Sequence, residues 1–355
     1  MIPKGRRLLD LDWTADPGRS MMYGIVDFDR RHFLNLTVLD TGTGVGEGGR
    51  YATAGEEPSA MLYGEKFLYQ LCDELDPDIC AITVNPDTGE VVSKSTGPQE
   101  HDLGACWPHY PTPEELGLPS HVKTIRRSEL LELQRLAPSV DLVSYKSESG
   151  RVEKAVFKYY FAPGDVHRRL REQQVLLHIG EHPNLTGLDL AVLDDSGQVV
   201  VGYLAKYSPA GNLLDNSSRP FKLSWLKQLI KVVDDMNLEY GIAHGNIQLE
   251  HILIDEANDM LKLSDMGHSS PMTGPGDLTD VWMTTSAVYE LITGSSLPLE
   301  GSSGPRRETA YLLRNLDAVG DWTPRPEIQL EDDIAAYQLV LQDWVNKRRS
   351  RDQPP

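Results

Sequence analysis

Side chains that could do chemistry gather in two short runs of this sequence. His244, Asn246 and His251 stand in one run, and Asp265 follows in the sequence Leu-Ser-Asp-Met-Gly. An amide such as that of Asn246 cannot accept a proton as a carboxylate can, so it is a poor general base. The imidazole of His251 is a softer ligand than the oxygen atoms that Mg²⁺ prefers. What these residues can do together depends on the elements that position them.

A strand-rich segment precedes the two runs. Segments rich in β-branched and aromatic residues, separated by turn sequences, predict two hairpins, 140–145 with 151–161 and 190–193 with 198–207. Apolar residues at helical spacing predict a helix over 165–179 between the hairpins.

Helices surround the two runs and follow them. One predicted helix has Ser224 as its N-cap and places apolar residues on a single face, namely Leu226, Leu229, Ile230, Val233 and Met236. Another, over 278–293, is predicted to end at Gly294, because glycine readily adopts the left-handed conformation that closes a helix. The order of elements is therefore a sheet, a connecting segment and a set of helices.

In this order, the two runs resemble the catalytic loop and the metal-binding loop of protein kinases. The kinase pattern is His-Arg-Asp-Leu, then Asn a few residues later, then Asp-Phe-Gly. His244 opens the first motif, Asn246 replaces its catalytic Asp, and His251 replaces its metal-binding Asn. Asp265 and Gly267 keep the second motif. The chain is thus similar to the protein-kinase-like superfamily, and the expected fold class is α+β: a two-lobed fold with a β-rich N-lobe and an α-helical C-lobe.

The resemblance covers about residues 130–295 and implies binding roles for several side chains. Lys158 matches the strand lysine that pairs with the α and β phosphates of a nucleotide. Glu172 matches the helix glutamate that holds this lysine, with Gln173 as the alternative because the spacing to the following His-Pro-Asn sequence is one residue longer than usual. Lys206 and Ser208 fall at the hinge, where backbone groups would face an adenine.

The same resemblance implies a metal site at Asp265, with His251 at the position of the ligand to a second Mg²⁺. We expect His251 to fill the pocket instead of binding metal. Ala137, Ser139 and Leu142 fall where kinases have phosphate-covering glycines. With Asn246 as a poor base, at a cost of about 10²–10⁴ in rate, the sequence predicts that ATP and Mg²⁺ bind weakly or not at all.

The segment after Asp265 is short. Residues 268–279 leave little room for a peptide-binding loop, and no Ala-Pro-Glu sequence is found. Asp280 opens a helix whose Asp-Val-Trp and Tyr-Glu-Leu-Ile-Thr-Gly sequences resemble a structural helix of kinases. We expect its carboxylate to hold the backbone of the catalytic-type loop.

An N-terminal α+β extension, residues 1–123, precedes the kinase-like N-lobe, 124–207, and C-lobe, 208–355. The extension is predicted to contain short strands at 23–27 and 34–40, a helix at 65–75, and a hairpin of 79–84 with 90–93. Its glycine-rich segment, 42–49, is predicted to be a loop, because no helix pattern follows it directly.

The composition indicates which classes of partner and which cellular compartment to expect. The formal net charge of −19 argues against nucleic acid, which needs a positive footprint. The three cysteines have no metal-binding spacing, which indicates reduced thiols. No apolar run approaches the roughly 20 residues of a membrane span, and the N-terminal sequence does not have the pattern of a signal peptide. We therefore expect a cytoplasmic protein with no membrane partner.

The sequence as a whole favours a pseudokinase that acts in binding or regulation, with an unknown protein partner or a small-molecule ligand. The Phe-Lys-Tyr-Tyr-Phe and Tyr-Gly-Ile-Ala-His sequences also resemble a group of uncharacterised filamentous-fungal kinase-like proteins. Two alternatives stay open. One is an active, atypical ATP-dependent phosphotransferase on a protein or small molecule that uses Lys158 and Asp265, and the other is a kinase fold recruited to different small-molecule chemistry.

Overall fold

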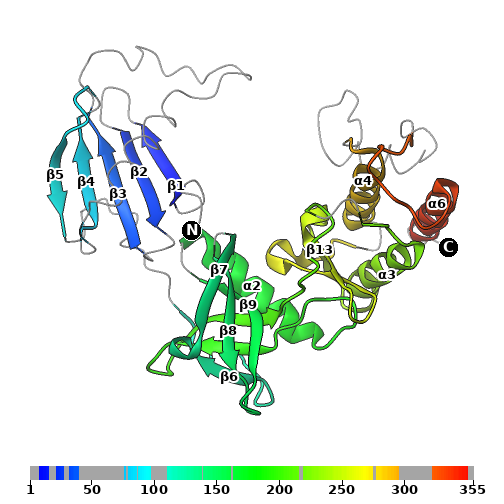
Figure 1. Cartoon of the computed structure of the whole chain (residues 1–355), viewed down its shortest axis with the longest axis horizontal. Helices are drawn as coiled ribbons and strands as arrows, with labels where there is room; N and C mark the ends of the chain where they lie inside the picture. Colours follow the sequence, from blue (N-terminus) through cyan, green and yellow to red (C-terminus); the bar gives the residue numbers. More distant parts are fainter. Residues whose placement is uncertain are drawn as a thin grey trace. The chain divides into compact units, whose positions relative to one another are not determined.

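The structure is a computed structural model with a mixed α+β fold, consistent with a kinase-like fold (Figure 1). It describes residues 8–15, 21–27, 32–39, 76, 79–85, 87–96, 110–137, 139–160, 163–215, 219–274, 277–295 and 322–350. The predicted helix at 65–75 and the glycine-rich segment 42–49 lie outside these residues. The chain divides into two compact units: Met1–Thr112 with Arg126–Val166 and Leu193–Gly202 form the first unit, and Pro113–Ile125 with His167–Val192 and Tyr203–Pro355 form the second.

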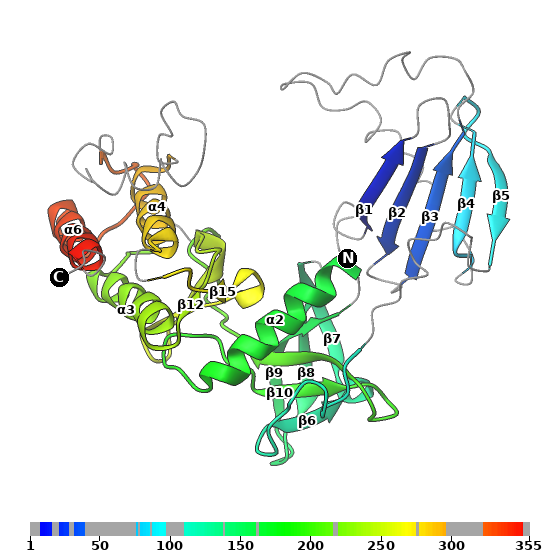
Figure 2. The ribbon, with the colours of Figure 1, turned by 180° about the vertical axis from the view of Figure 1, so that it is seen from behind.

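A five-stranded sheet makes up the N-terminal part of the first unit. Its strands lie in chain order, β1 (Leu8–Ala15), β2 (Met21–Asp27), β3 (His32–Val38), β4 (Ala81–Val84) and β5 (Val91–Ser95) (Figure 2). Neighbouring strands are antiparallel except β3 and β4, which are parallel. Leu36, Ile82 and Val84 are buried. The antiparallel pairing of β4 with β5 confirms the predicted hairpin.

A six-stranded sheet follows. Its strands are β6 (Lys123–Arg126), β7 (Leu131–Ala137), β8 (Val140–Lys146), β9 (Val152–Tyr159), β10 (Leu190–Leu193) and β11 (Val200–Lys206), in the spatial order β6-β10-β11-β9-β8-β7. The pairing of β8 with β9 confirms one predicted hairpin. A Cβ at Gly202 would lie 2.3 Å from the carbonyl oxygen of Lys158, so only glycine lets β11 approach β9 this closely.

The helices predicted within the described residues are present, with one correction. Helix α2 (Pro163–Ile179) ends before Gly180, and α4 (Thr279–Thr293) ends at Gly294, whose φ of 73° is left-handed. Helix α3 (Leu223–Asp234) was expected to have Ser224 as its N-cap, and this was wrong. The N-cap is Lys222, which has the extended backbone that a cap requires, whereas Ser224 already lies inside the helix.

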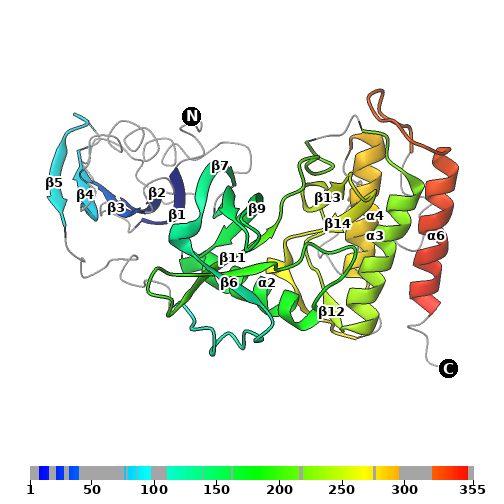
Figure 3. The same ribbon diagram turned by 60° about the horizontal axis from the view of Figure 1, so that its bottom comes forward.

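Helices α3 and α4 and the C-terminal helix α6 (Ile334–Ser350) form the core of the second unit, with α3 between the other two (Figure 3). A short π-helix, η4 (Asp235–Glu239), extends α3. Fully buried apolar residues fill the contacts: Leu226, Leu229 and Val233 of α3, Val281 and Ile292 of α4, and Tyr337, Leu341 and Val345 of α6. Among the helices of the described residues, none is both long and apolar enough to span a membrane.

Short elements of the same unit carry the residues whose side chains could do chemistry. A hairpin, β13 (Ile252–Asp255) with β14 (Met260–Leu263), follows the turn η5 (Leu249–His251). Asp265 lies between β14 and the turn η6 (Met266–His268). Strand β15 (Ser270–Pro271) then pairs with β12 (Ile242–Ala243). This pairing brings the segment after Asp265 against the start of the His244 loop.

Candidate functional site

The loop that begins at His244 is held by a buried carboxylate of α4. Asp280, which is 2% exposed, accepts hydrogen bonds from the backbone N–H of His244 at 2.7 Å and of Gly245 at 2.9 Å. A Cβ at Gly245 would lie 2.7 Å from the carbonyl oxygen of His268, and its φ is 75°, so the position requires glycine. The expectation that Asp280 holds the backbone of this loop is confirmed.

His244 links the loop to the segment that carries Asp265. Its Nδ1 lies 3.2 Å from the N–H of Asn246, and its Nε2 lies 3.0 Å from the carbonyl oxygen of Ser264. Because Nδ1 must accept and Nε2 must donate, the ring is in its neutral form. Burial lowers the pKa of His244, although the nearby Asp280 carboxylate opposes this shift. His244 is therefore a neutral structural bridge.

Asn246 and His251 lie against each other. The side-chain oxygen of Asn246 accepts a hydrogen bond from Nε2 of Gln248 at 2.8 Å, and its backbone oxygen accepts one from Nδ1 of His251 at 2.9 Å. The other ring nitrogen of His251, Nε2, lies 3.2 Å from Oδ2 of Asp265 and 3.4 Å from Oε1 of Glu250. Both ring nitrogens of His251 thus face oxygen acceptors.

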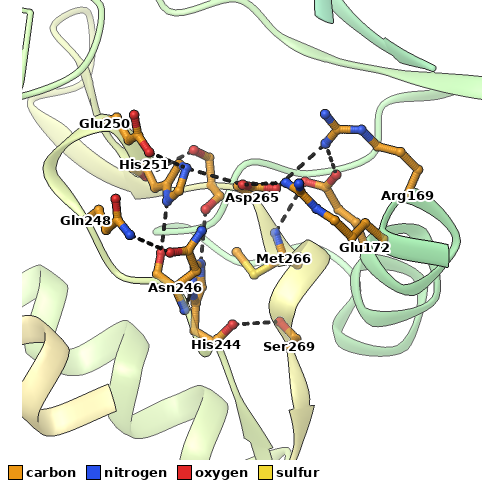
Figure 4. A network of polar contacts seen from close by, with 12 residues as sticks. Arg169, Glu172, His244, Asn246, Gln248, Glu250, His251, Asp265, Met266 and Ser269 are labelled. Carbon is orange, nitrogen blue, oxygen red and sulfur yellow. Dashed lines mark hydrogen bonds and ion pairs between the residues drawn. The ribbon is translucent and has the colours of Figure 1, made fainter. Parts of the chain in front are cut away.

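Asp265 lies between His251 and Arg169 of α2 (Figure 4). Arg168 of the same helix also approaches its carboxylate. Its Oδ1 is 3.7 Å from Nη1 of Arg169, and its Oδ2 is 3.7 Å from Nη2 of Arg168. The backbone of Asp265 is left-handed, with φ 65° and ψ 68°. For a residue with a side chain this conformation costs about 1–3 kcal/mol and is typical of functional sites.

Glu172 of α2 completes the group. Its side chain is 1% exposed, and its Oε2 lies 2.8 Å from Nη1 of Arg169. Its Oε1 accepts a hydrogen bond from the N–H of Met266, next to Asp265, at 3.3 Å. Although burial acts to lower the pKa of Arg169, the Glu172 and Asp265 carboxylates hold it above its ordinary value. Burial, and then the Glu172 carboxylate, raise the pKa of Tyr203 on β11.

The second unit brings together four of the predicted site residues, Glu172, Asn246, His251 and Asp265 (Figure 4). The contacts to Arg169 and Met266 are made by Glu172; its alternative Gln173 is also buried. Lys158 belongs to β9 in the first unit, in register with Val140.

The two predicted hinge residues have contacts of their own in the second unit. Nζ of Lys206, at the end of β11, lies 3.1 Å from Oδ2 of Asp255. The carbonyl oxygen of Ser208 accepts a hydrogen bond from the N–H of Gly211 at 3.1 Å in a turn. Lys206 therefore contacts the end of β13, within the same unit.

Arg168 and Arg169 were not among the predicted site residues. A signal for Arg169 was present, because residues three apart on a helix are neighbours, and the Arg-x-x-Glu spacing places Arg169 beside Glu172. The proximity of either arginine to Asp265 depends on tertiary structure.

The site does not fit a Mg²⁺ ion with the contacts it has. Mg²⁺ requires near-octahedral oxygen ligands at about 2.0–2.1 Å, whereas both carboxylate oxygens of Asp265 face nitrogen groups of Arg168, Arg169 and His251. Nδ1 of His251 is taken up by the carbonyl of Asn246. Within the described residues, no three His, Cys, Asp or Glu side chains gather as a metal-binding group.

Comparisons with known proteins point to kinases. No protein-family model matches the chain. It is 26% identical over 153 residues to the serine/threonine-protein kinase CHK1 of Saccharomyces cerevisiae, covering 35% of this chain and 28% of that protein. It is 34% identical over 105 residues to a probable cyclin-dependent kinase 10 of Dictyostelium discoideum, covering 28% of this chain and 27% of that protein. The matches thus span less than a third of either relative, and they support a protein-kinase-like protein.

Proposed function

We propose that this chain is a pseudokinase, a kinase-like protein with impaired phosphotransfer that acts in binding or regulation. Asn246 carries the proposal. It stands at the position of the catalytic base, and its side-chain oxygen accepts a hydrogen bond from Gln248. Around it the loop is well built, with Asp280 holding the backbone and His244 bridging to Ser264. A loop that is held in place but lacks its base is suited to binding more than to catalysis.

The nucleotide-binding part of the proposal rests on the turn before β8. Strands β7 and β8 pair closely there, with Ala137 in register with Val140. Ser139 in this turn is buried and has a φ of 56°. Kinases that cover phosphates use glycines, because a backbone without Cβ can approach closely and donate its N–H groups. ATP with Mg²⁺ is therefore proposed to bind weakly or not at all, and the ligand is a protein partner or another small molecule.

One observation favours an active, atypical phosphotransferase as the second candidate. Asp265 keeps its carboxylate and a strained left-handed backbone, and the buried Glu172 contacts the residue that follows it. Strain of this kind is often kept where a site works. Such an enzyme would need a route that does not use Asn246 as a base.

A turnover measurement separates the two candidates. The full chain is assayed for phosphate release and for phosphorylation of peptides and small molecules with ATP and Mg²⁺, next to Asp265→Asn. A pseudokinase gives the same background rate in both proteins. Turnover near the roughly 1–100 s⁻¹ of ordinary kinases that disappears in Asp265→Asn would reject the proposal in favour of the phosphotransferase.

A further inference from the structure

We infer that the Arg169 guanidinium is a built-in cation that links the Glu172 and Asp265 carboxylates and excludes divalent metal ions from this site. Its Nη1 lies 2.8 Å from Oε2 of Glu172 and 3.7 Å from Oδ1 of Asp265. One positively charged group is therefore hydrogen-bonded to the Glu172 carboxylate and ion-paired with the Asp265 carboxylate. The inference rests on the proposed function and deepens it, because it gives a physical reason why Mg²⁺ would not bind at this site.

Burial makes this charge balance important. The side chains of Arg169, Glu172 and Asp265 are 8%, 1% and 13% exposed. Charges removed from water are tolerated when they are paired and hydrogen-bonded. Without the guanidinium, two acidic groups would lie close together with little solvent to screen them, which is the environment that attracts a divalent cation.

The second oxygen of Asp265 is also approached by basic groups. Nη2 of Arg168 lies 3.7 Å from it, and Nε2 of His251 lies 3.2 Å from it. The Arg168 side chain is 42% exposed, so solvent screens its charge more than that of Arg169. Arg169 is thus the buried cation of the group, and a metal ion bound at Asp265 would have to lie beside it.

Hydrogen bonds within the second unit fix this geometry. Leu263, two residues before Asp265, donates its N–H to the carbonyl of Asn184 at 2.8 Å and accepts a hydrogen bond from the N–H of Thr186 at 2.9 Å. His182, shortly after α2, contacts Asp235 of η4 at 3.0 Å. The loop that follows α2, the helix that carries Arg169, is therefore hydrogen-bonded to β14, the strand that leads into Asp265.

The test is Mn²⁺ binding to the full chain without nucleotide, followed by electron paramagnetic resonance and calorimetry. We expect no saturable binding at Asp265 in the wild type. In Arg169→Gln we expect Mn²⁺ to bind at least about tenfold more tightly than in the wild type, and the gain should be lost in Arg169→Gln with Asp265→Asn. Arg171→Gln is the matched control, because Arg171 is exposed on the same helix and its loss should not create a site.

Three outcomes would overturn the inference. One is Mn²⁺ binding to the wild type that Asp265→Asn abolishes, and another is a folded Arg169→Gln protein that binds Mn²⁺ no better than Arg171→Gln. If Arg169→Gln does not fold, Arg169→Lys decides: it keeps the charge and must exclude Mn²⁺, so a gain of binding there contradicts the role of the cation. A wild type without turnover combined with an unchanged Arg169→Gln rejects this inference alone and leaves the proposed function standing.

Discussion

At the scale of single residues, two side chains hold the backbone of the loop that begins at His244, and two others contact each other beside Asp265. Asp280 and His244 make the expected backbone contacts. Asn246 and His251 contact each other and the neighbouring polar side chains. Structural and chemical roles in such a loop belong to different residues, so one set can be retained while the other changes.

The first prediction is that Asn246→Asp alone will not create an active enzyme. A base would be restored, but His251 would still lie against Asp265 and Arg169 would still neutralise it. Catalytic groups that act as a unit contribute non-additively, so one repair leaves the other defects limiting. The added carboxylate near Asp265 should also raise a carboxylate pKa and give no gain in stability.

This prediction is checked by measuring ATP turnover and melting temperature. The proteins compared are the wild type, Asn246→Asp, and the double variant Asn246→Asp with His251→Asn. We expect background turnover in all three. If Asn246→Asp alone gave a turnover of roughly 1–100 s⁻¹, Asn246 would be the single residue that prevents catalysis, and the pseudokinase proposal would be wrong.

A second prediction concerns Asp280. In Asp280→Asn, one oxygen becomes an amide group that donates, although both oxygens accept hydrogen bonds in the native protein. Loss of hydrogen bonds to a buried charged group should lower the free energy of unfolding by about 2–3 kcal/mol. Urea denaturation measures the change, with Asp343→Asn on the exposed side of α6 as the control. Equal stability of the two variants would show that the contacts to the loop are dispensable.

At the scale of elements, a buried polar chain connects the C-terminal helix to the loop. Arg348 of α6 lies 2.7 Å from Oδ1 of Asp234 and 3.0 Å from Oδ1 of Asn237 in η4. The amide of Asn237 in turn donates to Oδ2 of Asp280 at 2.7 Å. The short π-helix η4 thus carries an Asn237 side chain that contacts both α4 and α6. Short π-helical segments are frequent at functional sites.

The third prediction follows from this chain. Arg348 is 1% exposed, so Arg348→Met should leave Oδ1 of Asn237 without its buried donor and leave Asp234 with only the indole N–H of Trp344. The free energy of unfolding should fall by about 2–3 kcal/mol. Lys347→Met, at an exposed position on the same helix, should change it by less than about 0.5 kcal/mol. Urea denaturation gives both changes in free energy from the shifts of the unfolding midpoint, provided that the variants have the m-value of the wild type. Similar midpoints for the two variants would contradict the connecting role of Arg348.

Local pattern predicted most of these elements, and tertiary contacts explain the rest. The β8–β9 hairpin and helices α2 and α4 were predictable, because alternation, helical spacing and closing glycines are properties of neighbouring residues. The N-cap at Lys222 was not, because no preferred capping side chain marks it. The pairing of β15 with β12 involves only short segments far apart in sequence. The position of Arg169 near Asp265 likewise depends on how α2 packs.

At the scale of the whole molecule, a formal net charge of −19 and buried titratable groups connect stability to pH. His244 is fully buried and neutral, and burial lowers its pKa below the ordinary value of 6.5. Asp235, Asp255 and Asp277 have lowered pKa values, which hydrogen bonds cause against the opposing effect of burial. Their contribution is complete above the pKa of an unfolded carboxyl group, about 4, and is lost below it.

The last prediction separates His244 from these carboxylates by its pH range. As the pH falls through 6.5, the unfolded chain takes up a proton on this histidine while the folded protein does not, so unfolding becomes more favourable. One proton contributes at most about 1.4 kcal/mol per pH unit. The free energy of unfolding should therefore decline between pH 6.5 and 5, before the carboxylates contribute. The amide of His244→Gln does not titrate, so the slope of its free energy of unfolding against pH should be smaller by up to the contribution of one proton. His178→Gln, at an exposed position of α2, should have the slope of the wild type. Urea denaturation at half-unit pH steps gives the three slopes, and an unchanged slope in His244→Gln would mean that the neutral bridge between the loop and Ser264 does not control the pH dependence.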